Sequence, residues 1–283
     1  MARSTPDSTP RISFEYFPPK TPAGRDKLLQ ETTPALQALN PAFFSVTYGA
    51  GGSTRENTLG VASAIREAGI EVAPHLSFGG DDEAAIGALL DTYRERGIRR
   101  LVALRGDMPS GMGGTTQLVS ASQLVAFIRQ RSGDPFRIEV AAYPEIHPEA
   151  KSYDSDLQFL KGKLDAGANS AITQYFYNVE SYFYFLDQCA AIGIDKPIYA
   201  GIMPITNYAN LARFSRNCGA EIPRWICKRM EGYGEDQESI RKFGIEVVTQ
   251  LCQTLLESGA PGVHFYTMNQ VEPTREIYNN LGL

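Results

Sequence analysis

One glutamate of the sequence stands inside an aromatic run that is predicted to be a strand. The run Phe14–Pro19 reads Phe-Glu-Tyr-Phe-Pro-Pro, and an apolar pattern extends over Ile12–Phe17. Side chains alternate between the two faces of a strand. The alternation predicts one face toward neighbouring helices and one facing inward: Ile12, Phe14 and Tyr16 on the first, Ser13, Glu15 and Phe17 on the second.

A carboxyl group on an inward face loses its contact with water. Desolvation raises the pKa of such a group, so we expect a raised pKa for Glu15 and a role as general acid. The alternative interpretation is that Glu15 turns to solvent at the strand end. Because aromatic residues flank Glu15 on both sides, we favour the inward position.

Further polar residues stand at the ends of other apolar segments. Alternation turns several of them inward: Ser45, Thr47, His75, Ser77 and Gln174. A buried glutamine needs hydrogen-bond partners, and a ligand is one source of them. Arg105 and Asp107 either form a simple ion pair or, with Gly106 allowing close backbone approach, belong to a ligand site.

The segment that ends at Tyr143 is followed by Pro144 and Glu145 and then by the run His147-Pro148-Glu149. Those prolines exclude a zinc motif on a helix. The glycine-rich run Tyr48–Thr54 lacks the third glycine of a dinucleotide fingerprint, although a helix N-terminus there would suit an anion. The sequence also lacks a phosphate-binding P-loop and the nucleophile elbow of acyl-transfer enzymes.

The elements that must position these residues follow a repeated pattern. Helical stretches end at glycines, each followed by an apolar run, at Gly69, Gly97, Gly133, Gly167, Gly193 and Gly259, and Asn40 takes the same place earlier. The predicted strands are Ile12–Phe17, Phe43–Tyr48, Glu71–Ser77, Arg100–Arg105, Arg137–Tyr143, Ser170–Phe176, Pro197–Met203 and Gly262–Thr267. Alternating strands and helices imply parallel strands, and eight such units favour a (β/α)8 barrel, an α/β fold, over an open doubly wound sheet. Ser53 and Asn178 are expected to cap helices, and about three helices are expected between Gly193 and Gly259.

The composition limits the function classes. The chain has 283 residues, 43% hydrophobic and 21% charged, with a net charge of −5, which argues against nucleic acid as the main partner. Its four cysteines form no CxxC pair, so we expect reduced thiols, no metal site and a cytoplasmic location. No run is apolar enough to span a membrane. We expect residues 1–10 to be a disordered leader and residues 11–283 to form a single catalytic barrel domain.

At these same positions the sequence resembles the bacterial methylenetetrahydrofolate reductases. The matching motifs run in order along the chain: Phe14–Pro19, Ser45–Ala50, Ala73–Leu76, Ala103–Asp107, Ala141–Ser152, Asp165–Asn169, Ala171–Gln174 and His264–Asn269. The resemblance implies a barrel that binds FAD non-covalently and reduces 5,10-methylenetetrahydrofolate to 5-methyltetrahydrofolate. NADH or NADPH would supply the hydride in a ping-pong cycle.

The resemblance also implies roles for individual residues. Glu15 matches the general acid, and Asp107 matches a carboxylate near the flavin and the pterin. Residues that match positions lining the FAD are Thr47, Tyr48, Ala50, His75, Arg105, Gly106, Asp107, Tyr143, His147, Ala150, Asp156 and Lys163. Residues that match substrate-binding positions are Gln174, Phe214, Asn210 and Gln270. Relatives form homo-oligomers, so a homo-oligomer is expected.

Some positions depart from the common bacterial pattern. Gln270 stands where an arginine is frequent, Asn210 where a glutamine is common, and Gly162 replaces a basic residue near the adenosine side of FAD. Two other functions stay open on the sequence. A different barrel enzyme, such as an aldolase, would purify without flavin colour, and a barrel that only binds flavin or folate would not turn over.

Overall fold

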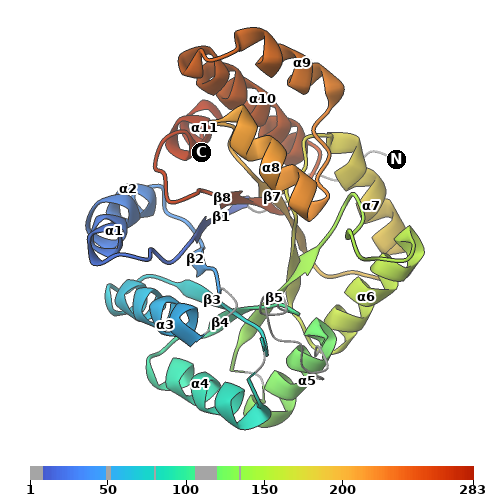
Figure 1. Ribbon diagram of the computed structural model, residues 1–283. Coiled ribbons are helices and arrows are strands. Elements are labelled where there is room, and N and C mark those ends of the chain that lie inside the picture. The colour runs from blue at the N-terminus through green and yellow to red at the C-terminus, as the bar shows by residue number, and fades with distance from the viewer. Residues whose placement is uncertain (1–8, 49–51, 80, 106–119, 134) are drawn as a thin grey trace.

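The computed structural model describes residues 9–48, 52–79, 81–105, 120–133 and 135–283. Their strands form one closed barrel in chain order, with every neighbouring pair parallel (Figure 1). The strands are β1 Arg11–Tyr16, β2 Phe43–Val46, β3 Val72–Leu76, β4 Arg100–Ala103, β5 Arg137–Ala142, β6 Ser170–Thr173, β7 Ile198–Ile202 and β8 Gly262–Tyr266. The predicted (β/α)8 barrel is therefore confirmed, and the open sheet is excluded because β8 pairs with β1.

Helices surround the barrel in Figure 1. They are α1 Pro22–Lys27, α2 Thr33–Gln37, α3 Gly52–Glu67, α4 Glu83–Glu95, α5 Ala121–Ser132, α6 Tyr153–Asp165, α7 Val179–Ala191, α8 Tyr208–Cys218, α9 Arg224–Tyr233, α10 Gln237–Glu257 and α11 Thr274–Asn280, with a π-helical turn, η1 Leu28–Thr32, between α1 and α2. The helices α8, α9 and α10 fill the long interval before β8, as expected. Among the described residues, no helix is long and apolar enough to cross a membrane.

The glycines that end the helices adopt a left-handed backbone conformation. Gly69, Gly97, Gly133, Gly167, Gly193 and Gly259 all have positive φ, and Asn40 has φ 51°. A Cβ atom disfavours this left-handed region, which explains why glycine ends these helices before the chain turns into the next strand. Asn178 caps α7 by accepting a hydrogen bond from the backbone of Glu180. The prediction for Ser53 was wrong, because α3 already begins at Gly52.

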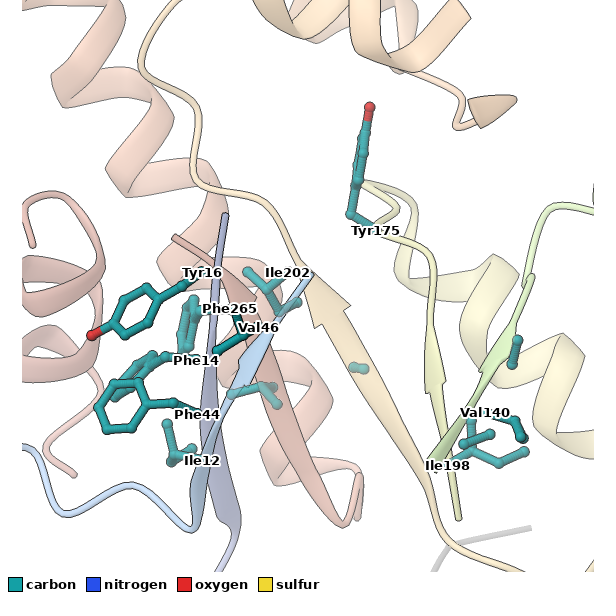
Figure 2. Packing of buried hydrophobic residues seen from close by; sticks show 14 of the residues in the cluster. Ile12, Phe14, Tyr16, Phe44, Val46, Val140, Tyr175, Ile198, Ile202 and Phe265 are labelled. Atoms are coloured by element: carbon teal, nitrogen blue, oxygen red, sulfur yellow. The ribbon is translucent and has the colours of Figure 1, made fainter. Parts of the chain in front are cut away.

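The two faces of the strands carry different packing. Figure 2 shows Phe14, Tyr16 and Phe44 together on the helix side of β1 and β2, where the rings of Tyr16 and Phe44 stack with centroids 5.0 Å apart. A separate cluster forms from residues of β2, β3, β4, β6 and β7: Phe43, Ala73, Val102, Ile172 and Tyr199. Alternation along β1 therefore sends Phe14 outward and leaves the opposite face of the strand to Glu15.

The strands end earlier than the sequence pattern predicts. For β6 this changes the interpretation, since the strand stops at Thr173 and Gln174 follows it. Phe176, predicted as the last residue of this strand, lies beyond its end and stacks on Tyr182 of α7 with ring centroids 5.4 Å apart. The chain turns after Thr173, so the two-residue period no longer applies to Phe176.

Candidate active site

Four strands bring a polar cluster together inside the barrel. Glu15 of β1 lies beside Ser45 of β2, its Cα partner in the parallel register, and Ser13 lies beside His264 of β8 in the same way. The hydroxyl of Ser45 donates to Oε2 of Glu15 over 3.1 Å. The Nε2 atoms of His264 and His75 lie 3.4 Å and 3.1 Å from the same oxygen. The inward position predicted for Glu15 is thus correct.

The charge of Glu15 differs from the sequence prediction. Burial raises the pKa of this carboxyl, but the nearby imidazoles of His75 and His264 lower it by more, and the pKa of Glu15 lies far below its ordinary value. The expected raised pKa was therefore wrong. The prediction counted desolvation and missed the two imidazoles, which come from strands far away in the sequence.

His75 completes this cluster from β3, and a larger cavity lies at the end of the same strand. Its Nε2 atom is within ion-pair distance of Glu15, yet the geometry gives no hydrogen bond, so a buried polar atom is left without a hydrogen-bond partner. The two residues that follow His75 line the cavity: Leu76, the last residue of β3, and Ser77. The cavity therefore borders the end of β3, the strand that carries His75 of the Glu15 cluster.

This cavity has a volume of about 400 Å³ and opens among the ends of β3, β4 and β5 and the start of α6. Its lining contains most of the described residues expected at a flavin: Tyr48, Arg105, Tyr143, His147, Ala150, Asp156 and Lys163. The lining does not include Thr47 or His75. Ala50, Gly106 and Asp107 lie outside the described residues. The structure therefore does not describe the second predicted catalytic carboxyl, Asp107, or the expected close approach of a ligand to the backbone at Gly106.

A buried lysine forms one wall of the cavity. The Nζ atom of Lys163 donates to the carbonyl oxygen of Ala141 over 2.5 Å. Burial lowers the pKa of Lys163 to about 8, although the carboxylate of Asp156 acts in the opposite direction. An ammonium group held this way has unused hydrogen-bonding capacity and is poorly solvated. An anionic ligand group beside it would therefore stabilise its protonated, charged form.

The loop after β5 is fixed against this wall. Asp156 accepts a hydrogen bond from the backbone of His147 over 2.8 Å, and the ring of His147 lies edge-on to Tyr143. The Nδ1 atom of His147 accepts from the backbone of Glu149 over 3.0 Å. In the neutral ring the proton is therefore on Nε2, so His147 is held as a hydrogen-bond donor.

Arg105 has a partner that the sequence did not suggest. Its Nη2 atom lies 2.5 Å from Oε2 of Glu149, and both side chains are partly open to solvent at the cavity. Across the cavity, the hydroxyl of Tyr48 donates to Asp81 over 3.4 Å. The alternative of an ion pair between Arg105 and Asp107 is untested, because Asp107 is not described.

The predicted substrate residues lie apart from this cavity. Gln174 lines a second, small cavity with Tyr143, Glu145 and Cys218, and its Oε1 atom accepts from the backbone of Tyr175. Asn210 and Phe214 lie on α8, where the guanidinium of Arg213 contacts both. Gln270 is exposed after β8. Within the described residues, no contact joins these side chains to Glu15, and their substrate role stays a prediction.

Several residues of the site were not proposed as functional from the sequence. His264 and Ser13 complete the Glu15 cluster, and Glu149 and Phe159 line the large cavity. The alternation of side chains along β8 could have identified His264, because it assigns this polar side chain to one face of the strand. No sequence signal pointed to Glu149. In the described part of the chain, no group of His, Cys, Asp and Glu side chains is arranged to hold a metal ion.

Comparison with known proteins matches the chain to a single family. The family model described as methylenetetrahydrofolate reductase matches residues 1–282. The chain is 41% identical to a 5,10-methylenetetrahydrofolate reductase of Pectobacterium carotovorum over 273 residues, covering 96% of this chain and 90% of that protein. With the same coverage it is 39% identical to the protein of that name from Escherichia coli.

A longer plant relative and a solved structure extend this comparison. The maize protein named methylenetetrahydrofolate reductase (NADH) 1 is 38% identical over 291 residues, covering 98% of this chain and 49% of that protein. A Clostridium thermocellum protein solved with 5-methyl-5,6,7,8-tetrahydrofolic acid has a TM-score of 0.68, with 17% identity over 96% of this chain and 94% of that chain. At this identity the likeness shows a shared fold.

Proposed function

The chain belongs to the methylenetetrahydrofolate reductase family of oxidoreductases, and we propose that it reduces 5,10-methylenetetrahydrofolate to 5-methyltetrahydrofolate with hydride from NADH or NADPH. The reaction would use non-covalently bound FAD and follow a ping-pong order, in which the nicotinamide leaves before the folate enters. The observation that carries the proposal is the buried carboxyl of Glu15, held by His75 of β3, together with a cavity at the end of β3 that Lys163 and Tyr143 line.

The described residues fit a bound flavin nucleotide. The cavity offers the rings of Tyr48 and Tyr143, the buried cation of Lys163 and the donor of His147. We assign Lys163 and Arg105 to the anionic part of the nucleotide and the tyrosines to its rings. The flavin, when bound, supplies the hydride chemistry.

The remaining steps are assigned to side chains of this chain. Glu15 donates a proton to the folate, which opens its five-membered ring to the iminium form that accepts hydride. Asp107, on the resemblance in sequence, places a negative charge that favours this cation. Gln174, Phe214, Asn210 and Gln270 are proposed to hold the folate. We also propose that the protein acts as a homo-oligomer.

A spectroscopic experiment tests the function directly. The purified protein, loaded with FAD, is reduced anaerobically with NADH or NADPH and then mixed with methylenetetrahydrofolate. We expect the flavin absorbance to bleach and then to return as 5-methyltetrahydrofolate forms. A colourless protein that FAD cannot reconstitute would overturn the proposal in favour of another barrel enzyme. A protein that stays yellow with both nicotinamides would retain the flavin site and require another electron donor.

A further inference from the structure

The two carboxyl oxygens of Glu15 have different hydrogen-bonding surroundings. Ser45 donates to Oε2, and the Nε2 atoms of His75 and His264 face the same oxygen. Among the described residues, no side chain forms a hydrogen bond or ion pair with Oε1. The carboxylate is only 6% exposed, so this difference is set by the protein rather than by bulk water. One oxygen is held by the barrel, and the other is left for a ligand.

The hydrogen bonds of His264 determine which of its nitrogens carries a proton. The hydroxyl of Ser45 has one hydrogen, which it donates to Glu15, so its 3.3 Å contact with Nε2 of His264 requires a hydrogen on Nε2. Nδ1 lies 2.7 Å from the hydroxyl of Ser13, which can donate to it. The opposite tautomer would turn a lone pair of Nε2 toward the carboxylate 3.4 Å away, which is repulsive.

We propose that His264, held in its Nε2–H form by Ser13, is a positioning residue that makes Oε2 of Glu15 the hydrogen-bond acceptor and Oε1 the atom that carries the catalytic proton. This inference rests on the proposed function. Oε1 first takes up a proton from solvent water; in the transfer the O–H bond at Oε1 breaks, an N–H bond forms on the folate nitrogen, and Glu15 is left as a carboxylate. The donors of Ser45 and His264 stabilise the negative charge at Oε2, which makes Glu15 a stronger acid.

The protonation of His264 can be measured without turnover. The chain has three histidines, so selective ¹⁵N labelling of histidine in the FAD-loaded protein gives a spectrum that single substitutions can assign. We expect the His264 ring to carry its proton on Nε2, with Nδ1 as an acceptor whose signal changes in Ser13→Ala. A neutral His264 with its proton on Nδ1 would overturn the proposal, whatever the activity of the protein.

Two substitutions of His264 separate positioning from packing. In His264→Gln the side-chain amide reaches the place of Nε2 and keeps a donor for Glu15 and Ser45. In His264→Asn the amide lies near Nδ1, keeps the contact with Ser13 and loses the donor. We expect Asn to slow flavin reoxidation by methylenetetrahydrofolate about 10²-fold, as for a catalytic group moved by about 1 Å. Gln should recover most of this loss, and flavin reduction by the nicotinamide should change little in both.

A matched control is available at the other end of the barrel interior. Ser170 is buried like Ser13 but donates to Glu139 instead of a histidine. Ser170→Ala should leave both half-reactions unchanged, whereas Ser13→Ala should slow reoxidation alone. Equal rates in His264→Asn and the wild type, or equal loss with Gln and Asn, would overturn the positioning role. A wild type that folate cannot reoxidise would instead overturn the proposed function. Should the His264 variants fail to fold, Ser13→Ala and the wild-type spectrum still decide.

Discussion

The amine of Lys163 lies 2.5 Å from the carbonyl oxygen of Ala141, so a cation of α6 is held against the end of β5. Burial lowers the pKa of this amine to about 8, well within the range of ordinary buffers. Because Lys163 lines the cavity, the proton on its amine contributes to the charge that a ligand meets there. We therefore expect binding of the proposed FAD to depend on pH.

We predict that Lys163→Met weakens FAD binding by about 10- to 100-fold, the effect of losing one charge-assisted hydrogen bond of roughly 1.5–3 kcal/mol. The measurement is a fluorescence titration of the apoprotein with FAD. Lys161→Met is the control, because Lys161 lies on the same helix and pairs with Asp165 outside the cavity. Equal FAD affinities of the wild type and Lys163→Met would contradict the assignment of Lys163 to the anionic part of the nucleotide.

The pH dependence of binding follows from the same lysine. Below pH about 8 the free protein carries the charge that attracts an anion, and above it the amine is neutral. FAD affinity of the wild type should therefore fall as pH rises through about 8, by at most tenfold per pH unit. Lys163→Met should remove this slope. For folding the sign is opposite, since the fold lowers this pKa and stability rises with pH between about 8 and the unfolded value of 10.5.

A second prediction concerns the exposed carboxylate that pairs with Arg105. Glu149 competes with any anionic ligand for this guanidinium, and its contact with Arg105 lowers the pKa of Glu149. We expect Glu149→Gln to tighten FAD binding a few-fold and to leave thermal stability almost unchanged, because water and salt screen an exposed ion pair. Weaker FAD binding in Glu149→Gln would show that the carboxylate helps to hold the ligand instead.

The third prediction tests Glu15 through the two half-reactions. Glu15→Gln should slow folate reduction by roughly 10²–10⁴-fold, the range for loss of a general acid. Flavin reduction by NADH or NADPH needs no proton from Glu15 and should be nearly unchanged. Stopped-flow absorbance measures both steps in one preparation. An equal loss in the two steps would show that Glu15 has only a structural role.

Much of the fold was predictable because its signals are local. Glycines with positive φ end the helices, and alternation within a single strand sends Phe14 and Glu15 to opposite faces. These signals need only a few neighbouring residues. The same reasoning overextended β6 to Phe176, because nothing in the alternation marks the hydrogen bonds at which a strand leaves its neighbours.

The electrostatics of the site was less predictable because it depends on distant residues. The pKa of Glu15 is set by His75 and His264, which lie on β3 and β8 and meet Glu15 only after the barrel closes. Burial alone predicted a raised pKa for Glu15, whereas its pKa is lowered. The pair of Arg105 with Glu149 also depends on the course of the loop after β5. The residue types were recognisable in the sequence, but the balance of their charges required the three-dimensional contacts.

The fourth prediction concerns a buried ion pair among the strands. Arg100 of β4 lies 2.6 Å from Glu139 of β5, over the ring of Phe43, and burial raises the pKa of Glu139. Arg100→Met should destabilise the fold by about 3–5 kcal/mol, because it leaves a buried carboxylate with less compensation. Arg100→Met combined with Glu139→Gln should recover part of this loss in chemical unfolding.

The pH dependence gives an independent check of that pair. Removing Arg100 raises the pKa of Glu139 further, so the native variant holds a proton that the unfolded chain has lost. The stability of Arg100→Met relative to the wild type should therefore fall as pH rises from about 5 to 8. A deficit that does not change with pH would show that lost packing on Phe43, and not charge, explains the effect.

The fifth prediction compares two glycines that both lie inside helices. A Cβ atom at Gly244 of α10 would lie 2.3 Å from the carbonyl oxygen of Ile205, whereas a Cβ at Gly162 of α6 would meet nothing within 4 Å. Gly162→Ala should stabilise the protein by about 0.5–1 kcal/mol through helix propensity, and Gly244→Ala should destabilise it because a backbone oxygen cannot yield easily. Thermal unfolding of both variants measures the two signs side by side. Stabilisation by Gly244→Ala would mean that α10 packs less closely against the end of β7 than the structure indicates.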